Sequence, residues 1–186
     1  ALEYDSRKVE ADNCFFAVVG TASDGHNYIP MAVERGAKAI VCQRLPESLC
    51  DDVAYIVVED TNEAMAMMAA AYYDHPSEEL RLVGVTGTNG KTTTATLLYD
   101  MTMAMGYRAG LISTVVYRIG EERIPSTHTT PDAIRLNAMM RRMVDSGCDY
   151  CFMEVSICNF YHVWVNTCTL CSGSEGILMH TWGTGT

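Results

Sequence analysis

One stretch of ten residues constrains the fold of this chain more than any other. It follows the apolar pair Leu82-Val83, precedes an apolar-patterned segment at 95–105, and reads Gly84-Val85-Thr86-Gly87-Thr88-Asn89-Gly90-Lys91-Thr92-Thr93. This order predicts a strand, a glycine-rich turn and a helix, which is the context in which a phosphate loop works. The turn lets backbone N–H groups converge on phosphate oxygens, and the helix presents its positive N-terminal end.

The chemistry of the loop predicts a nucleoside triphosphate site with magnesium. Lys91 can reach the terminal phosphates, and the Thr92 hydroxyl can ligate Mg²⁺. Val85 stands where the common G-x-x-x-x-G-K-[ST] form has its first glycine. The alternative is a glycine-rich turn that binds nothing, but Gly90-Lys91-Thr92 after an apolar strand favours phosphate binding.

Bulk composition sets the class of protein. A chain of 186 residues with 48% hydrophobic content can hold one large domain or two small ones. A formal charge of -10 argues against a nucleic-acid binder. We expect no membrane partner, because no apolar run is long enough to span a bilayer and no signal peptide is recognisable. Eight cysteines without a secretory signal indicate reduced thiols, and hence a cytoplasmic protein. We expect the protein to be a monomer.

The first part of the chain reads as a small α/β unit, residues 1–78. Strands are expected at 14–19, 39–42 and 55–58, with helices at 28–35 and after Asp60. The second helix has apolar residues at helical spacing, which predicts that its buried face consists of Ala64, Met67, Met68 and Ala71.

The second part, residues 79–156, continues from the phosphate loop. A strand at 109–114, a hairpin at 115–125 and a strand at 150–155 are expected. A helix begins with Thr130 as N-cap and Pro131 in its first turn, and its apolar stripe is Leu136, Met139, Met140 and Met143. Alternating strands and helices predict a parallel sheet with right-handed crossovers. Residues 157–186 show no clear period, and no element is expected there.

Glu154 lies at the carboxyl end of a predicted core strand, residues 150–155. Ligands of open α/β sheets bind at the carboxyl ends of the strands, so this carboxylate could hold magnesium beside Thr92. A solvent-facing glutamate fits the spacing equally well.

The run Ser126-Thr127-His128-Thr129-Thr130-Pro131-Asp132 places four hydroxyls and one imidazole before a helix. It could bind an anionic substrate, but its chemistry alone favours a helix cap, and His128 alone is better read as a surface histidine.

Two cysteine pairs match the spacing of a zinc site: Cys148-x-x-Cys151 and Cys168-x-x-Cys171. Cys151 lies inside a predicted strand, which counts against this interpretation.

Together these motifs resemble the Mur ligases of bacterial cell-wall synthesis, most closely the MurE branch. The resemblance covers about residues 4–156. Beside the phosphate loop it rests on Asp5-Ser6-Arg7, Val18-Val19-Gly20, Asp24-Gly25-His26, Tyr28-Ile29-Pro30, Gly36-Ala37, Thr129-Thr130-Pro131-Asp132 and Met153-Glu154-Val155-Ser156. MurF ligases share part of this set, whereas folylpolyglutamate synthetases are expected to share only the loop.

The resemblance implies roles by matched position. The UDP end of the substrate would contact Tyr4, Ser6, Thr21, Ala22 and Ser23. ATP would lie on Gly87, Thr88, Asn89, Gly90, Lys91, Thr92 and Thr93. Thr92 and Glu154 would hold Mg²⁺, and Lys91 and Glu154 would be catalytic. The muramoyl-dipeptide would contact Thr129, Thr130 and Ser156, with His128 adjacent.

The implied fold is a small N-terminal α/β substrate domain followed by part of a P-loop parallel-sheet ATPase domain. The implied activity is ATP-dependent addition of a diamino acid, meso-diaminopimelate or L-lysine, to UDP-N-acetylmuramoyl-L-Ala-D-Glu through an acyl phosphate. A MurF-like ligase, a P-loop nucleotide-binding protein without ligase activity and a zinc-stapled interaction module are the alternatives.

The tail departs from the family. Ile157-Cys158-Asn159 follow Ser156 where the family continues with Ser-His. The family's magnesium-binding histidine, its carbamylated lysine and its C-terminal domain have no counterpart in the sequence. We therefore expect residues 157–186 to arise from a frameshift or truncated gene, and the chain to be an inactive fragment.

Overall fold

The computed structural model describes residues 1–20, 23–125 and 131–155, together with the backbone of 177–179. The chain divides into two compact units, Ala1–Met68 and Ala69–Thr186. The division falls inside one helix, so the boundary expected after residue 78 stays a prediction. The α/β fold class is confirmed, because both units combine helices with parallel strands.

The first unit is built on a four-stranded parallel sheet in the order β1-β2-β3-β4. Its elements are β1 Leu2–Glu3, β2 Cys14–Phe16, the 3₁₀ helix η1 Gly25–Tyr28, α1 Ile29–Glu34, β3 Ala39–Cys42 and β4 Ala54–Val57. In the core of this unit, α1 packs against the sheet: Ile29 and Ala32 of α1 lie in one cluster with Phe15 of β2 and Ile40 of β3.

Helix α2, Thr61–Tyr72, begins as expected, because Asp60 Oδ1 accepts hydrogen bonds from the Asn62 and Glu63 amides at 2.7 and 3.4 Å. Its expected buried face is wrong: Met67 is 56% exposed and Ala71 is exposed. The buried residues are Thr61, Met65, Ala66, Ala69 and Ala70. Because residues 64–71 are all alanine or methionine, several faces of this helix fit the same apolar spacing.

The second unit has a six-stranded sheet in the order β10-β5-β9-β6-β7-β8. Its elements are α3 Pro76–Glu79, β5 Arg81–Val85, α4 Lys91–Ala104, β6 Ala109–Ile112, β7 Val116–Ile119, β8 Glu122–Pro125, α5 Ala133–Asp145, β9 Tyr150–Glu154 and β10 Ile177–Met179. The expected parallel arrangement holds for β5, β9 and β6, while the hairpin β7–β8 and the strand β10 are antiparallel to their neighbours. No element was expected in the tail, yet β10 pairs with β5.

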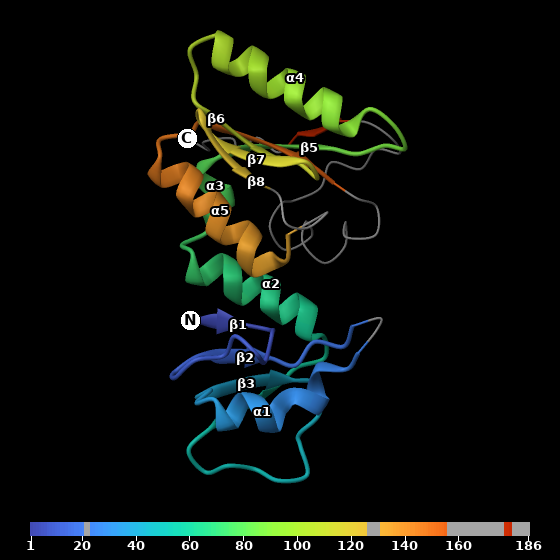
Figure 1. Ribbon diagram of the computed structural model, residues 1–186, viewed down its shortest axis with the longest axis vertical. Helices are drawn as coiled ribbons and strands as arrows, with labels where there is room; N and C mark the ends of the chain where they lie inside the picture. Colours follow the sequence, from blue (N-terminus) through green and yellow to red (C-terminus); the bar gives the residue numbers. More distant parts are fainter. Residues whose placement is uncertain (21–22, 126–130, 156–176, 180–186) are drawn as a thin grey trace, which may run out of the picture. The chain divides into compact units, whose positions relative to one another are not determined.

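This sheet is covered on both faces, with α4 on one and α5 on the other (Figure 1). Ala95 and Tyr99 of α4 pack in one core, and Leu136, Met140 and Met143 of α5 pack in the other. The predicted stripe on α5 is confirmed. The predicted cap is wrong, because Asp132 is the N-cap and its side chain accepts from the Arg135 amide at 2.9 Å.

Candidate nucleotide-phosphate site

The loop between β5 and α4 has the geometry that the sequence predicts. β5 ends at Val85, α4 begins at Lys91, and Gly90 is the N-cap with a φ of 81°. Gly87 has a φ of 140°. A Cβ on Gly90 would meet nothing within 4 Å, so its positive φ, not crowding, demands glycine there.

Lys91 places its charge on this loop. The Lys91 ammonium donates to the Gly87 carbonyl at 2.6 Å, and its side chain is half-buried. The first turn of α4 is closed by the Thr94 amide donating to the Gly90 carbonyl at 2.8 Å. A fixed cation, positive-φ glycines and a helix N-terminus therefore meet within a few residues, which suits an anion.

Glu154 is the last residue of β9 and the register partner of Val85, where the loop begins. Two residues earlier on the same face, Phe152 packs in the core beneath α4, so Glu154 points to the α4 side of the sheet. Its side chain is only 7% exposed. The interpretation of Glu154 as a solvent-facing residue is therefore wrong.

The two carboxylate oxygens of Glu154 have different surroundings. Oε2 accepts a hydrogen bond from the Thr114 hydroxyl at 3.3 Å, and Oε1 is buried without a partner. A second buried oxygen without a partner, Thr86 Oγ1, lies at the adjoining end of β5. Buried oxygens without partners are costly unless a ligand, water or ion completes them.

This donor set fits Mg²⁺. The cation prefers oxygen ligands and is commonly held by one or two carboxylates together with phosphates and water. Within the described ranges no group of three or more His, Cys, Asp or Glu side chains could hold a metal by itself. Thr92 and Glu154 would therefore serve as partial ligands of a metal–phosphate complex.

The first unit contains the residues expected at the UDP end of the substrate. Tyr4 is 37% exposed, Ser23 is exposed, and Ser6 is buried with its hydroxyl directed at Met31 Sδ, 3.5 Å away. Thr21 and Ala22 lie outside the described residues. Asp5 lies between Tyr4 and Ser6 in the sequence. Hydrogen bonds from the Arg7 guanidinium lower the pKa of the Asp5 carboxyl group to about 2.

A hydrogen-bonded cluster follows Ser23. Asp24 Oδ1 accepts from the His26 amide at 2.9 Å and contacts His26 Nδ1 at 2.6 Å, while Oδ2 accepts from Arg44. These contacts, led by the amide hydrogen bond, lower the pKa of Asp24 to about 2. His26 Nε2 accepts from the Gln43 amide at 2.9 Å, so the proton sits on Nδ1 and the imidazole is held in one tautomer.

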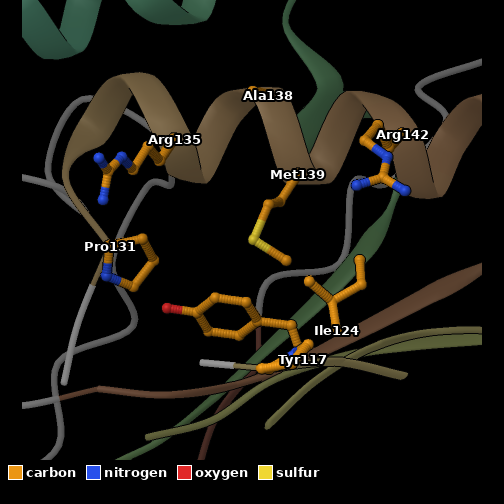
Figure 2. Close-up of a pocket in the computed structure, with 8 residues that line it drawn as sticks. Tyr117, Ile124, Pro131, Arg135, Ala138, Met139 and Arg142 are labelled. Carbon is orange, nitrogen blue, oxygen red and sulfur yellow. The ribbon is translucent and has the colours of Figure 1, made fainter. Parts of the chain in front are cut away.

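A cavity of about 310 Å³ lies between α5 and the β7–β8 hairpin. In Figure 2, Met139 extends from α5 toward Tyr117 and Ile124, with Arg135 and Arg142 further along the helix on either side. Pro125 and Pro131 also line it, and they flank the segment expected to contact the muramoyl-dipeptide. His128, Thr129 and Thr130 of that segment, like Ser156, lie outside the described residues.

The cysteine pair at Cys148 and Cys151 is buried in the core beneath α5. Burial raises the pKa of the Cys148 thiol, which disfavours the thiolate that zinc would need. Cys168 and Cys171 lie outside the part of the chain that the structure describes.

The strand–loop–helix unit, with Lys91 on the loop and a buried carboxylate on the next strand, defines a protein of the phosphate-loop class. The chain belongs to the Mur ligase family. Residues 1–73 match the Mur ligase family catalytic domain, and residues 85–173 match the Mur ligase middle domain. The resemblance found in the sequence is thereby confirmed.

Similar proteins and solved structures carry the names of ligases. The UDP-N-acetylmuramoyl-L-alanyl-D-glutamate--2,6-diaminopimelate ligase of Phocaeicola vulgatus is 54% identical over 155 residues, which is 83% of this chain and 32% of that protein. The chain thus spans about a third of the length of the curated relatives it matches.

Solved structures support the same fold. One of a ligase with the same name covers 90% of this chain and 34% of its own, with a TM-score of 0.76 at 24% identity. The MurF ligase of Thermotoga maritima in complex with ADP covers 82% of this chain and 31% of its own, with a TM-score of 0.51 at 25% identity.

Two features of these sites were not singled out from the sequence. Thr114 follows β6 at the same edge as the loop, and its place at the carboxyl end of a predicted strand was the available signal. The contact between His26 and the Gln43 amide had no such signal, because it joins residues 17 apart through a backbone group.

Proposed function

We propose that this chain is part of an ATP-dependent amide ligase that adds 2,6-diaminopimelate to UDP-N-acetylmuramoyl-L-Ala-D-Glu in peptidoglycan synthesis. The names of the 54%-identical relative and of others like it support the substrate and the amino acid. Because the chain spans about a third of their length, the proposal concerns the whole ligase.

The observation that carries the proposal is the pairing of loop and carboxylate. Lys91 lies on the phosphate loop, and Glu154 lies buried on the neighbouring strand, opposite the residue where the loop begins. In this proposal Gly87–Thr93 cradle ATP, Lys91 neutralises its terminal phosphates, and Thr92 with Glu154 holds Mg²⁺. The residues assigned to substrate by matched position keep those roles.

The chemistry suits such a site. A carboxylate is a poor electrophile, so the D-glutamate side chain first takes the γ-phosphoryl group of ATP and releases ADP. The neutral amine of diaminopimelate then attacks the acyl phosphate, forms the amide bond, expels inorganic phosphate and loses a proton. Bound Mg²⁺ would offset charge on the transferring phosphoryl group, and Lys91 would position the phosphates.

Calorimetry on the full chain separates the two halves of this proposal. We expect binding of MgATP and, independently, of UDP-N-acetylmuramoyl-L-Ala-D-Glu. Lys91→Ala should weaken ATP binding by about 10- to 100-fold, since a hydrogen bond to a charged group is lost, and leave the uridine ligand unaffected. Ser6→Ala should lower the affinity for the uridine ligand and leave the affinity for ATP unchanged.

The controls identify the competing functions. ATP binding without any affinity for the uridine ligand would favour a nucleotide-binding protein of another kind. If the chain binds the uridine ligand but Lys91→Ala leaves its ATP affinity unchanged, the assignment of this segment as a phosphate loop is wrong. For the whole ligase, product formation without release of ADP and phosphate would rule out the acyl-phosphate route.

We further propose that the ligase acts as a cytoplasmic monomer without nucleic-acid or membrane partners. The formal charge of -10 supports the absence of a nucleic-acid partner. In the described part of the chain, no helix is long and apolar enough to cross a bilayer. Sedimentation of the purified protein at several concentrations tests the oligomeric state.

A further inference from the structure

The carboxyl edge of the second sheet carries a hydroxyl that neither the phosphate-loop pattern nor the family resemblance uses. β9 lies between β5 and β6. β5 leads into the phosphate loop, and β6 leads through Ser113 to Thr114, so Glu154 has the loop on one side and Thr114 on the other.

We propose that Thr114 is a positioning residue that directs the Glu154 carboxylate toward a divalent cation bound with nucleotide. This proposal rests on the proposed nucleotide site. The Thr114 hydroxyl donates to Oε2 at 3.3 Å, and Oε1, buried and without a partner, is left as the oxygen that ligates. A neutral hydroxyl can orient a carboxylate without cancelling its charge, and at 3.3 Å this contact is longer than most hydroxyl–oxygen hydrogen bonds.

Thr114 is itself held in place by the turn that contains it. The hydroxyl of the buried Ser113 donates to the Val116 carbonyl at 2.8 Å and accepts from the Val115 and Val116 amides at 3.3 and 3.1 Å. A rigid turn with a threonine at its exposed corner fixes the donor in advance. Orientation of a metal ligand by such an outer hydrogen bond is a general means of tuning a metal site.

The environment of Thr114 makes the test clean. Its side chain is exposed, so Thr114→Val removes the hydroxyl, keeps the shape and opens no cavity. Thr114→Ser restores the hydroxyl. Val115→Ala is the matched control, because the neighbouring Val115 is 70% exposed and its side chain makes none of these contacts.

The experiment measures the coupling between Mg²⁺ and ATP. ATP affinity for the full chain is determined by calorimetry in excess Mg²⁺ and in EDTA, and the ratio gives the factor by which the cation strengthens binding. We expect Thr114→Val to reduce this factor by about three- to tenfold, the usual worth of one such hydrogen bond, with the EDTA affinity unchanged. Thr114→Ser and Val115→Ala should both resemble wild type.

A double-mutant cycle with Glu154→Gln tests whether Thr114 acts through that carboxylate. In the Glu154→Gln background, Thr114→Val should cause no further loss of coupling. An additive loss, or a coupling factor unchanged by Thr114→Val alone, overturns the inference and leaves the nucleotide site standing. Absence of ATP binding by the wild-type chain overturns both the inference and the proposed nucleotide site.

Discussion

Gly25 is the first residue of η1 and lies against the backbone that follows β2, at Ala17 and Val18. A Cβ on Gly25 would lie 2.6 Å from both Val18 N and Val18 O, and 2.8 Å from Ala17 C. All three are backbone atoms, so no side-chain rotation relieves the clash. The Gly25 amide also donates to the Val18 carbonyl at 2.8 Å. Gly25→Ala must therefore displace the backbone at Ala17 and Val18 or the start of η1.

The expected cost follows from these contacts. Crowding of this kind costs about 1 to 3 kcal/mol. Loss of the amide hydrogen bond adds about 1 kcal/mol. Replacing glycine also stiffens the unfolded chain, which offsets about 0.4 to 1 kcal/mol. Taken together, these contributions should cost the first unit about 1 to 3.6 kcal/mol of unfolding free energy.

Hydrogen exchange followed by mass spectrometry reports on each unit separately. Protection of peptides covering β2 and β3 should fall by about 5- to 400-fold in Gly25→Ala, and peptides covering β6 should not change. Gly20→Ala is the matched control in the same segment, because its Cβ would meet only the Ser23 carbonyl, at 3.2 Å. Protection within threefold of wild type, or equal losses in both variants, would refute the reasoning.

Three further predictions concern other parts of the molecule. Because the folded pKa of Asp24 is lowered from 3.8 to about 2, its contribution to stability is complete above pH 4 and is lost as pH falls toward 2, so wild type and Asp24→Asn should converge at low pH in urea titrations. Met143→Ala should cost about 2 to 5 kcal/mol in urea unfolding of the second unit, because Met143 is fully buried. Asp132→Ala should cost about 1 kcal/mol by removing the α5 cap.

Each of these has a result that contradicts it. A stability difference between wild type and Asp24→Asn that is constant from pH 6 to pH 2 would contradict the predicted pH dependence of the Asp24 contribution. Met143→Leu should retain most of the stability, so equal losses for leucine and alanine would count against a cavity effect. Asp132→Asn should keep the cap, and a loss as large as that of alanine would contradict the capping role.

The geometry of the loop between β5 and α4 could be predicted from the sequence because its causes are local. Glycines at fixed spacing, a lysine and a following helix determine the loop, and the edge rule for parallel sheets placed Glu154 beside it. The environment of Glu154 required the structure, since the hydrogen bond from Thr114 joins residues 40 apart. Spacing could not choose between a buried and an exposed carboxylate.

The buried face of α2, the N-cap of α5 and the strand β10 could not be predicted from the sequence pattern, because tertiary contacts select among several alternatives that the pattern allows. The buried face of α2 depends on packing, because a helix with apolar residues on every side has no preferred stripe. The cap of α5 was a choice between neighbouring residues with similar capping ability, and Asp132 rather than Thr130 takes that position. The tail strand β10 is set by pairing with β5, a contact that local sequence does not encode.

The position of β9 between β5 and β6 determines the order in which the second unit can fold. Arg81 and Tyr150 are register partners 69 residues apart, and β6, the β7–β8 hairpin and α5 lie between them in the chain. During synthesis the phosphate loop emerges early, but the strand that anchors it and supplies Glu154 emerges last of the three parallel strands. Closing so long a segment is entropically costly and slows folding. On a nascent chain, nucleotide binding would thus report that β9 has joined β5 and β6. The four parallel strands of the first unit pair through much shorter connections.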